Sequence, residues 1–99
     1  MNGCEVAEGA VRVPNQAGLH ARPAGRVAAL VERFRAEVEL GNGSEWVDAS
    51  SVLSILSLGL AHGALVRIRA RGEDALEAVR AVAELIEGLG DDQDFEPSG

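Results

Sequence analysis

The sequence predicts an α+β fold, an open-faced β-sandwich whose four-stranded, mostly antiparallel sheet is covered on one face by three helices. Three observations support this class. Strand-like alternation and helix-like spacing of apolar residues follow each other in the order β-α-β-β-α-β-α. Each expected strand has only one apolar face, so helices have only one side of the sheet to cover. A chain of 99 residues also has the right length for one domain with one core.

A short loop separates the first strand from the first helix. Residues 5–13 alternate, with Val11 and Val13 on one face, and predict a strand. Proline, asparagine and glycine in residues 14–18 predict a loop. Helical spacing then begins, and Gly25 weakens that helix by about 1 kcal/mol relative to alanine, which points to close approach of another surface. The apolar stripe of this helix consists of Ala24, Val27, Ala28, Val31 and Phe34.

The remaining strands come from three alternating segments. Residues 37–40 alternate strictly, and the Asn-Gly pair in residues 41–44 predicts a hairpin turn into a returning strand over 45–49. Residues 65–71 alternate again, with apolar side chains on one face and arginines on the other. We expect the polar face of the sheet to be a solvated charge ladder rather than an anion-binding site. Its charged members are Arg12, Arg67, Arg69, Arg71, Glu37 and Glu39.

Two further helices complete the pattern. Ser50 or Ser51 can cap a short helix that runs to Leu58, and Gly59 suits its end. The last helix is expected over residues 73–88, with an apolar stripe on its inner side.

The charge is uneven along the chain. The net charge is −7, and four of the acidic residues lie in the last nine positions. Without them, twelve acidic residues face nine arginines, which leaves a net charge of −3. We therefore expect residues 1–90 to form the domain and residues 91–99 to form a disordered acidic tail. The acidic balance and the few aromatic residues argue against nucleic-acid binding.

The sequence favours a cytoplasmic protein that binds no membrane. No apolar run reaches the roughly 20 residues of a membrane span, and the N-terminus lacks the pattern of a secretory signal. Cys4 is the only cysteine, so no disulfide can form within the chain, which fits a reducing compartment. His20 and His62 are isolated from Cys4 and from paired acids, so we expect no metal and no cofactor.

Residues 18–24 (GLHARPA) lie where the extended stretch turns into the expected helix. A helix start carries backbone N–H groups and the positive end of the helix dipole, which together bind phosphate. His20 could therefore accept a phosphoryl group whose oxygens meet the N–H groups of Ala21 and Arg22 and the Arg22 guanidinium. The residues alone leave a second interpretation open, a turn histidine that caps the helix beside Pro23, an ordinary first-turn proline.

Residues 18–24, followed by SVLSILSLG at 51–59, resemble the histidine-containing phosphocarrier proteins (HPr) of the bacterial phosphotransferase system. The resemblance implies that enzyme I, charged by phosphoenolpyruvate, phosphorylates His20, and that His20 passes the group to a IIA component of a sugar permease. The protein would then be a stoichiometric relay rather than a true catalyst. Arg22 and Pro23 match the family's active-site arginine and motif proline.

The same resemblance puts the family's regulatory serine, which a kinase phosphorylates in some lineages, at Ser51. The alternative for Ser51 is an N-cap hydroxyl. Ser50 and Ser54 stand where the family often has a lysine and a glycine, so the surroundings that a serine kinase or phosphatase would recognise have changed. Ala17 replaces a small polar residue near the phosphate, so one possible hydrogen bond to the phosphate is missing.

A carrier this small must dock on larger partners. The second helix is more apolar than its buried side requires, and helical spacing turns Leu53 and Leu56 outward. The resemblance implies that this helix and the histidine-bearing helix form one docking face, with Arg22 and Arg26 at its rim. The candidate docking residues are Ala24, Val52, Leu53 and Leu56. The alternative is that these apolar residues belong to the core.

Two functions are consistent with these residues. The intact motif from His20 to Pro23 favours a monomeric relay whose partners are enzyme I and IIA components. The surroundings of Ser51 and the acidic tail favour a regulatory module of the nitrogen-type or kinase-linked branch, not coupled to sugar uptake. A third interpretation, a hydrolase that uses His20 as a base, lacks a candidate nucleophile with a spaced acid.

Overall fold

The structure is a computed structural model that describes residues 5–90. Cys4 and the expected acidic tail, residues 91–99, lie outside the described residues. The elements follow the predicted order, and their bounds are β1 (Val6–Arg12), α1 (Ala21–Val31), β2 (Glu37–Gly41), β3 (Trp46–Asp48), α2 (Val52–Ser57), β4 (Leu65–Arg71) and α3 (Ala75–Gly88).

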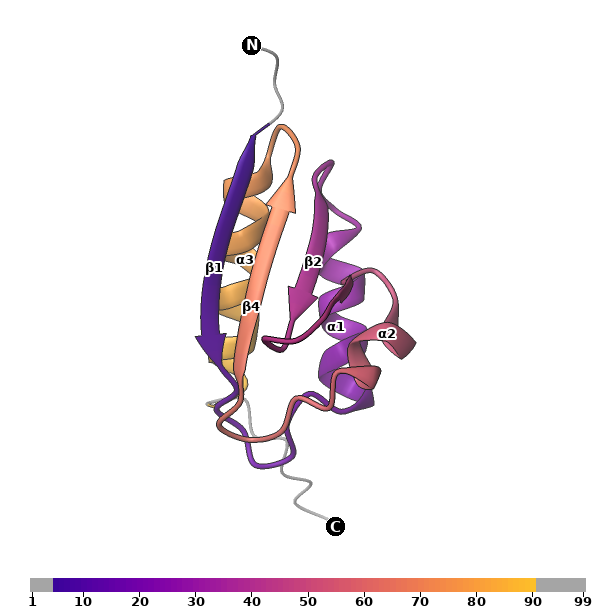
Figure 1. The fold of residues 1–99 in the computed structure, drawn as a ribbon, viewed down its shortest axis with the longest axis vertical. Coiled ribbons are helices and arrows are strands. Elements are labelled where there is room, and N and C mark those ends of the chain that lie inside the picture. The colour runs from indigo at the N-terminus through magenta and orange to yellow at the C-terminus, as the bar shows by residue number, and fades with distance from the viewer. Residues whose placement is uncertain (1–4, 91–99) are drawn as a thin grey trace.

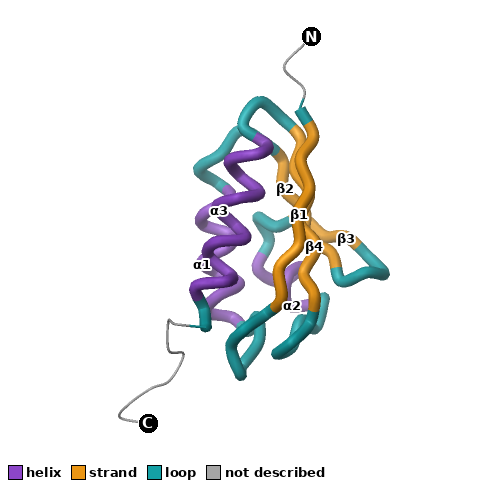
Figure 2. Tube along the Cα trace, turned by 90° about the vertical axis from the view of Figure 1, so that its left-hand side faces the viewer, coloured by secondary structure: helices purple, strands orange, loops and turns teal. Residues whose placement is uncertain are grey.

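The sheet has the strand order β1-β4-β2-β3, and every neighbouring pair is antiparallel. Strand β4 therefore lies between the strands that come first and second in the chain (Figure 1). Helices α1 and α3 lie on the same side of the sheet (Figure 2), and α2 packs against α1 and β3. The predicted α+β sandwich is thus confirmed, with a sheet that is antiparallel throughout.

The core lies between the sheet and the helices and is aliphatic. Its largest fully buried side chains come from every layer and include Leu40, Ile55, Ile68, Val82 and Ile86. Burying each such side chain contributes about 1.5–3 kcal/mol, so this apolar layer provides the main stabilisation of the fold. None of the helices within residues 5–90 is long and apolar enough to cross a membrane.

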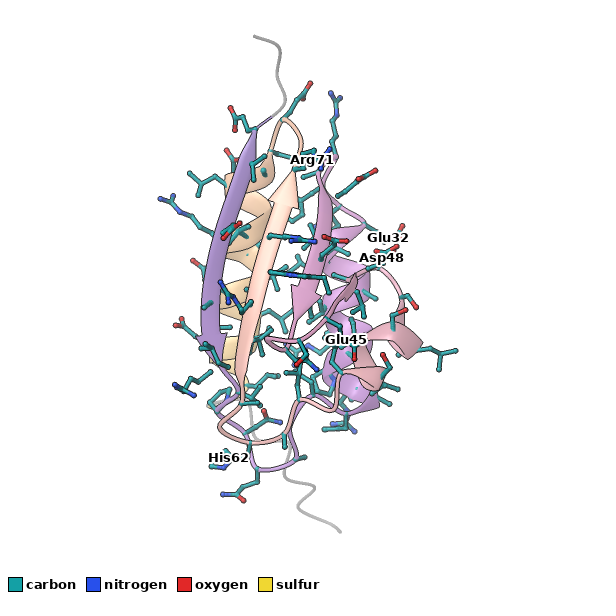
Figure 3. All side chains as sticks on the ribbon, in the orientation of Figure 1. Glu32, Glu45, Asp48, His62 and Arg71 are labelled. Carbon is teal, nitrogen blue, oxygen red and sulfur yellow. The ribbon has the colours of Figure 1, made fainter. Side chains whose placement is uncertain are left out.

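The other face of the sheet is open and carries the predicted charge ladder. The strand register puts Arg69 between Glu8 and Glu39, and its Nε donates to Glu39 Oε1 over 2.6 Å. The Arg69 guanidinium stacks on the Trp46 ring, with Arg69 Cζ 3.9 Å from the ring centroid. The sequence did not indicate this contact. Arg71 continues the ladder at the end of β4 (Figure 3), opposite Glu37.

Connections gather at the two ends of the sheet (Figure 1). At one end, the turns after α1 and after β4 are joined by Asp74, whose carboxylate accepts from the backbone N–H of Arg35 over 3.0 Å and of Ala36 over 2.8 Å. Gly72 lies against Ala36 with a φ of +142°, a conformation that only glycine adopts readily. The loops before α1 and before β4 meet at the other end.

Candidate functional site

His20 is the N-cap residue of α1. Its backbone is extended, and its carbonyl accepts the first intrahelical hydrogen bond, from Ala24 N over 3.0 Å. Its side chain makes no capping hydrogen bond to the helix. His20 therefore stands at the cap position, as the interpretation of a histidine that caps the helix expected, while its side chain does not serve as the cap.

The loop that leads to His20 is tethered to the loop before β4. Leu19 is buried, and its N–H donates to Leu60 O over 2.9 Å. Gly18 has a φ of +74°, and a Cβ at this position would lie 2.7 Å from Leu60 O. Glycine is needed here both for the backbone conformation and for the close approach. Asn15, buried in the same loop, donates from Nδ2 to Gly18 O over 3.0 Å.

His20 borders an open hollow of about 290 Å³ between these two loops. Its lining residues are Ala17, Leu19, His20, Gly59, Leu60 and Ala61. The Nε2 atom of His20 is buried, so an attacking group would have to reach the ring on the side of Nδ1. His62, the other histidine of the chain, is exposed in the loop at the same end (Figure 3).

The start of α1 suits an anion. Ala21 and Arg22 are exposed and precede the first intrahelical N–H donor, Ala24, while Pro23 has no N–H to offer. The first turn of α1 contains no acidic residue, so no carboxylate within that turn offsets the positive end of the helix dipole. The structure therefore brings Ala21 and Arg22 next to His20 at a helix start, as the sequence predicted.

Helix α2 presents an apolar surface beside the N-terminal half of α1 (Figure 1). Leu53 is 79% exposed and Leu56 is 36% exposed, which confirms that these two side chains face outward. Val52 is half-buried. The expectation that Ala24 contributes to a docking face is wrong, because its side chain is fully buried on the inner stripe of α1.

Gly25 is not required by the internal packing of the protein. A Cβ at this position would meet no atom within 4 Å, so no neighbouring element comes close enough to exclude a side chain. A glycine inside a helix lowers helix stability by about 1 kcal/mol relative to alanine. The packing of the described residues does not explain why glycine occupies this position.

Ser51 is the N-cap residue of α2, and its Oγ accepts a hydrogen bond from Ser54 N over 3.2 Å. The N-cap interpretation is therefore confirmed. Ser50 instead donates from its N–H and its hydroxyl to Asp48 Oδ1. These two hydrogen bonds lower the pKa of Asp48 below the usual carboxyl value, because they stabilise its ionised form.

Sequence reasoning missed two residues that organise the ends of the fold. Asn15 lies in the predicted loop, but the sequence did not indicate its hydrogen bond to Gly18. Asp74 is the N-cap residue of α3, within the start expected for that helix, but its side chain makes no cap hydrogen bond and instead accepts from the backbone N–H groups of Arg35 and Ala36. Arg35 and Ala36 lie far from Asp74 in the sequence, so no local pattern could reveal these hydrogen bonds. No three metal-binding side chains gather anywhere in residues 5–90.

The site thus combines an open-faced sandwich, a histidine at a helix start with no acidic residue in its first turn, and an exposed apolar helix beside it. The family model described as "PTS HPr component phosphorylation site" matches residues 7–88. The chain is 38% identical over 81 residues to the phosphocarrier protein HPr of Haloferax volcanii, covering 80% of this chain and 91% of that protein.

A second relative is the phosphocarrier protein NPr of Shewanella violacea, 34% identical over 82 residues, with 83% and 90% of the two chains covered. Among solved structures, HPr-C-His from Thermoanaerobacter tengcongensis superposes with a TM-score of 0.80 at 33% identity, covering 86% of this chain and 96% of that one. The chain therefore belongs to the HPr family of phosphocarriers of the phosphotransferase system (PTS).

Proposed function

We propose that the protein accepts a phosphoryl group on His20 from phosphorylated enzyme I and passes it to a IIA component of a sugar permease. The observation that carries this proposal is the position of His20, at a helix start with no acidic residue in its first turn and with a side chain that does not cap the helix. Membership of the family supports enzyme I as the kind of phosphoryl donor.

The reacting atom follows from the burial of the ring. Because Nε2 is buried, we assign the attack to Nδ1. The Nδ1 lone pair forms the new N–P bond while the bond between phosphorus and its donor atom on enzyme I breaks. In the second transfer, the acceptor's nucleophile bonds to phosphorus while the N–P bond at His20 breaks, which restores the Nδ1 lone pair. The phosphoryl oxygens would meet the N–H groups of Ala21 and Arg22 and the Arg22 guanidinium, so positioning and charge stabilisation account for the catalysis of transfer.

Docking would use the exposed side of α2. Leu53 and Leu56, with Val52 at their edge, present apolar surface, and Arg22 and Arg26 supply positive charge on the neighbouring helix. Exposed apolar side chains surrounded by polar ones are typical of protein–protein contacts. Phosphorylation of Ser51 by a serine kinase would put negative charge beside this surface and weaken the docking of enzyme I without unfolding the helix.

We further propose that the relay is monomeric and cytoplasmic and is formed by the domain in residues 1–90, with residues 91–99 as an acidic tail. The relay is consumed and regenerated in each cycle and requires no cofactor.

A second candidate function is a regulatory module of the nitrogen-type or kinase-linked branch. The relationship to the Shewanella NPr supports it, at an identity close to that of the HPr relatives. Ser50 and Ser54 stand near Ser51 where the family often has a lysine and a glycine, so the surroundings of the regulatory serine differ from the usual ones. A pull-down with the phosphorylated protein separates the two functions, because the relay retains a IIA domain and the regulatory module retains a regulator or kinase.

The proposal is tested by incubating the protein with enzyme I and phosphoenolpyruvate. We expect one acid-labile, base-stable phosphate, which is lost in His20→Ala and retained in His62→Ala, the matched control at the only other histidine. Arg22→Ala should slow transfer by roughly tenfold to a hundredfold, the range for hydrogen bonds to charged groups. A phosphate that survives in His20→Ala would refute the assignment.

A further inference from the structure

Asn15 is the one polar side chain that is buried among residues 5–90, with 6% of its surface exposed. It lies five positions before His20, in the loop between β1 and α1. A buried amide is unfavourable unless hydrogen bonds replace its contacts with water, so its place in this loop requires a reason.

Two hydrogen bonds of Asn15 converge on Gly18. Asn15 Nδ2 donates to Gly18 O over 3.0 Å, and Asn15 O accepts from Gly18 N over 3.2 Å. The carbonyl of Gly18 belongs to the same peptide unit as the N–H of Leu19, which donates to Leu60 O over 2.9 Å. This peptide unit is therefore held at both ends, by Asn15 on one side and by the loop before β4 on the other.

His20 follows directly after this fixed unit. The Gly18 Cα lies so close to Leu60 O that no side chain fits, and Leu19 is buried, so the backbone before His20 has little room to shift. On its other side, His20 is fixed by the first hydrogen bond of α1. The position of the imidazole relative to the N–H groups of Ala21 and Arg22 therefore depends on the orientation of the Gly18–Leu19 peptide.

We infer that Asn15 is a positioning residue for phosphoryl transfer, which acts by fixing the Gly18–Leu19 peptide and, through it, His20. This inference rests on the proposed function, in which His20 is the phosphoryl acceptor. Asparagine suits the role because its amide donates to a carbonyl, whereas the isosteric carboxylate of aspartate would only repel it. Transfer depends steeply on such geometry, since small displacements of reacting groups produce large losses of rate.

The test compares Asn15→Ala and Asn15→Asp with Asp74→Ala, which removes the same kind of side-chain-to-backbone link at the opposite end of the fold. Phosphorylation by enzyme I and phosphoenolpyruvate is measured while the concentration of the full-length carrier is varied. We expect kcat to fall about tenfold in Asn15→Ala and further in Asn15→Asp, with KM changed by less than about twofold. Asp74→Ala should retain both constants.

Amide hydrogen exchange provides a readout that does not depend on enzyme I. We expect the Leu19 amide to exchange at least about tenfold faster in Asn15→Ala, while amides of the central strand β4 keep their protection. If the wild type accepts no phosphate, the proposed function fails and exchange still tests the tether. An unchanged Leu19 exchange rate, or a wild-type kcat in Asn15→Ala, would overturn the inference.

Discussion

The starts of α1 and α3 face opposite ends of the sheet, and they differ in how their positive ends are used (Figure 1). Helix α3 has Glu77 in its first turn, whereas the first turn of α1 has no acidic residue. A carboxylate in the first turn offsets the helix dipole from within the chain. The first turn of α1 contains no such carboxylate, and the N-cap residue of this helix is a histidine.

The two ends also differ in what ties their turns together. The end near α3 is joined by an ionised carboxylate, Asp74, that binds the N–H groups of Arg35 and Ala36. At the end near α1, the two loops are joined by the backbone hydrogen bond from Leu19 N–H to Leu60 O. The neutral amide of Asn15 supports this link from within its own loop by donating to Gly18 O, and it adds no negative charge. The comparison teaches that one fold can use side-chain-to-backbone hydrogen bonds at both ends, while only one of the two side chains, Asp74, carries a negative charge.

The largest effect is expected when α1 is made to resemble α3. Ala21→Glu puts a carboxylate in the first turn of α1, where it should stabilise the helix by about 0.3–1 kcal/mol. The same charge repels the incoming phosphoryl group, so we expect phosphorylation by enzyme I to fall at least about a hundredfold. Thermal unfolding and steady-state phosphorylation measure the two effects.

Leu76→Glu, which adds the same charge to the first turn of α3, is the matched control and should leave transfer unchanged. Equal losses in both variants would mean that total charge, and not the start of α1, governs the reaction.

A smaller effect is expected from the apolar surface of α2. Leu53→Ala removes a side chain that is 79% exposed, so stability should change by no more than about 0.5 kcal/mol. If this surface docks on enzyme I, KM should rise about tenfold with kcat retained. Leu65→Ala removes an exposed leucine from the open face of the sheet and should leave KM unchanged. A KM that responds to Leu65 and not to Leu53 would move the docking surface to the sheet.

Gly25→Ala separates stability from docking. Alanine meets no atom within 4 Å, so the substitution should stabilise α1 by up to about 1 kcal/mol. If a partner approaches this part of the helix closely, the added methyl group should raise KM several-fold in the same variant. Gly88→Ala in α3, where a Cβ also meets nothing, is the control. A stabilised Gly25→Ala with a wild-type KM would show that no partner uses the space.

The smallest functional effect is expected at the opposite end. Hydrogen bonds from Arg35 and Ala36 lower the pKa of Asp74, so its folded form favours the ionised carboxylate. A lowered pKa contributes stability at pH values above the ordinary carboxyl pKa, and this contribution disappears as the pH falls through the lower folded value. Asp74→Ala should therefore be less stable at neutral pH and should lose less stability on acidification below about pH 4. Denaturant unfolding at several pH values checks this, and an unchanged acid sensitivity would contradict it.

The element order could be predicted because each segment shows its own period, as in residues 37–40 and 65–71. The helical period of α1 also assigned Ala24 to the inner stripe, and its placement in a docking face came only from the resemblance, which the burial corrects. The stacking of Trp46 on Arg69 depends on the register of two strand pairs, which no local pattern specifies.

The site could be predicted only in part, because some of its residues form a local pattern and others depend on distant contacts. The motif from Gly18 to Ala24 is contiguous, so the sequence alone predicted that His20, Ala21 and Arg22 lie together. The contribution of Asn15 depends on Leu60, more than forty positions away, because their two hydrogen bonds fix one peptide unit between them.

Nitrogen-15 NMR of the histidine rings, before and after phosphorylation by enzyme I, tests the central claim most directly. The account predicts a phosphorus-coupled signal at Nδ1 of His20, with the ring of His62 unchanged. A phosphorus coupling at Nε2 of His20 or at His62, or phosphorylated protein with no change in either ring, would contradict it.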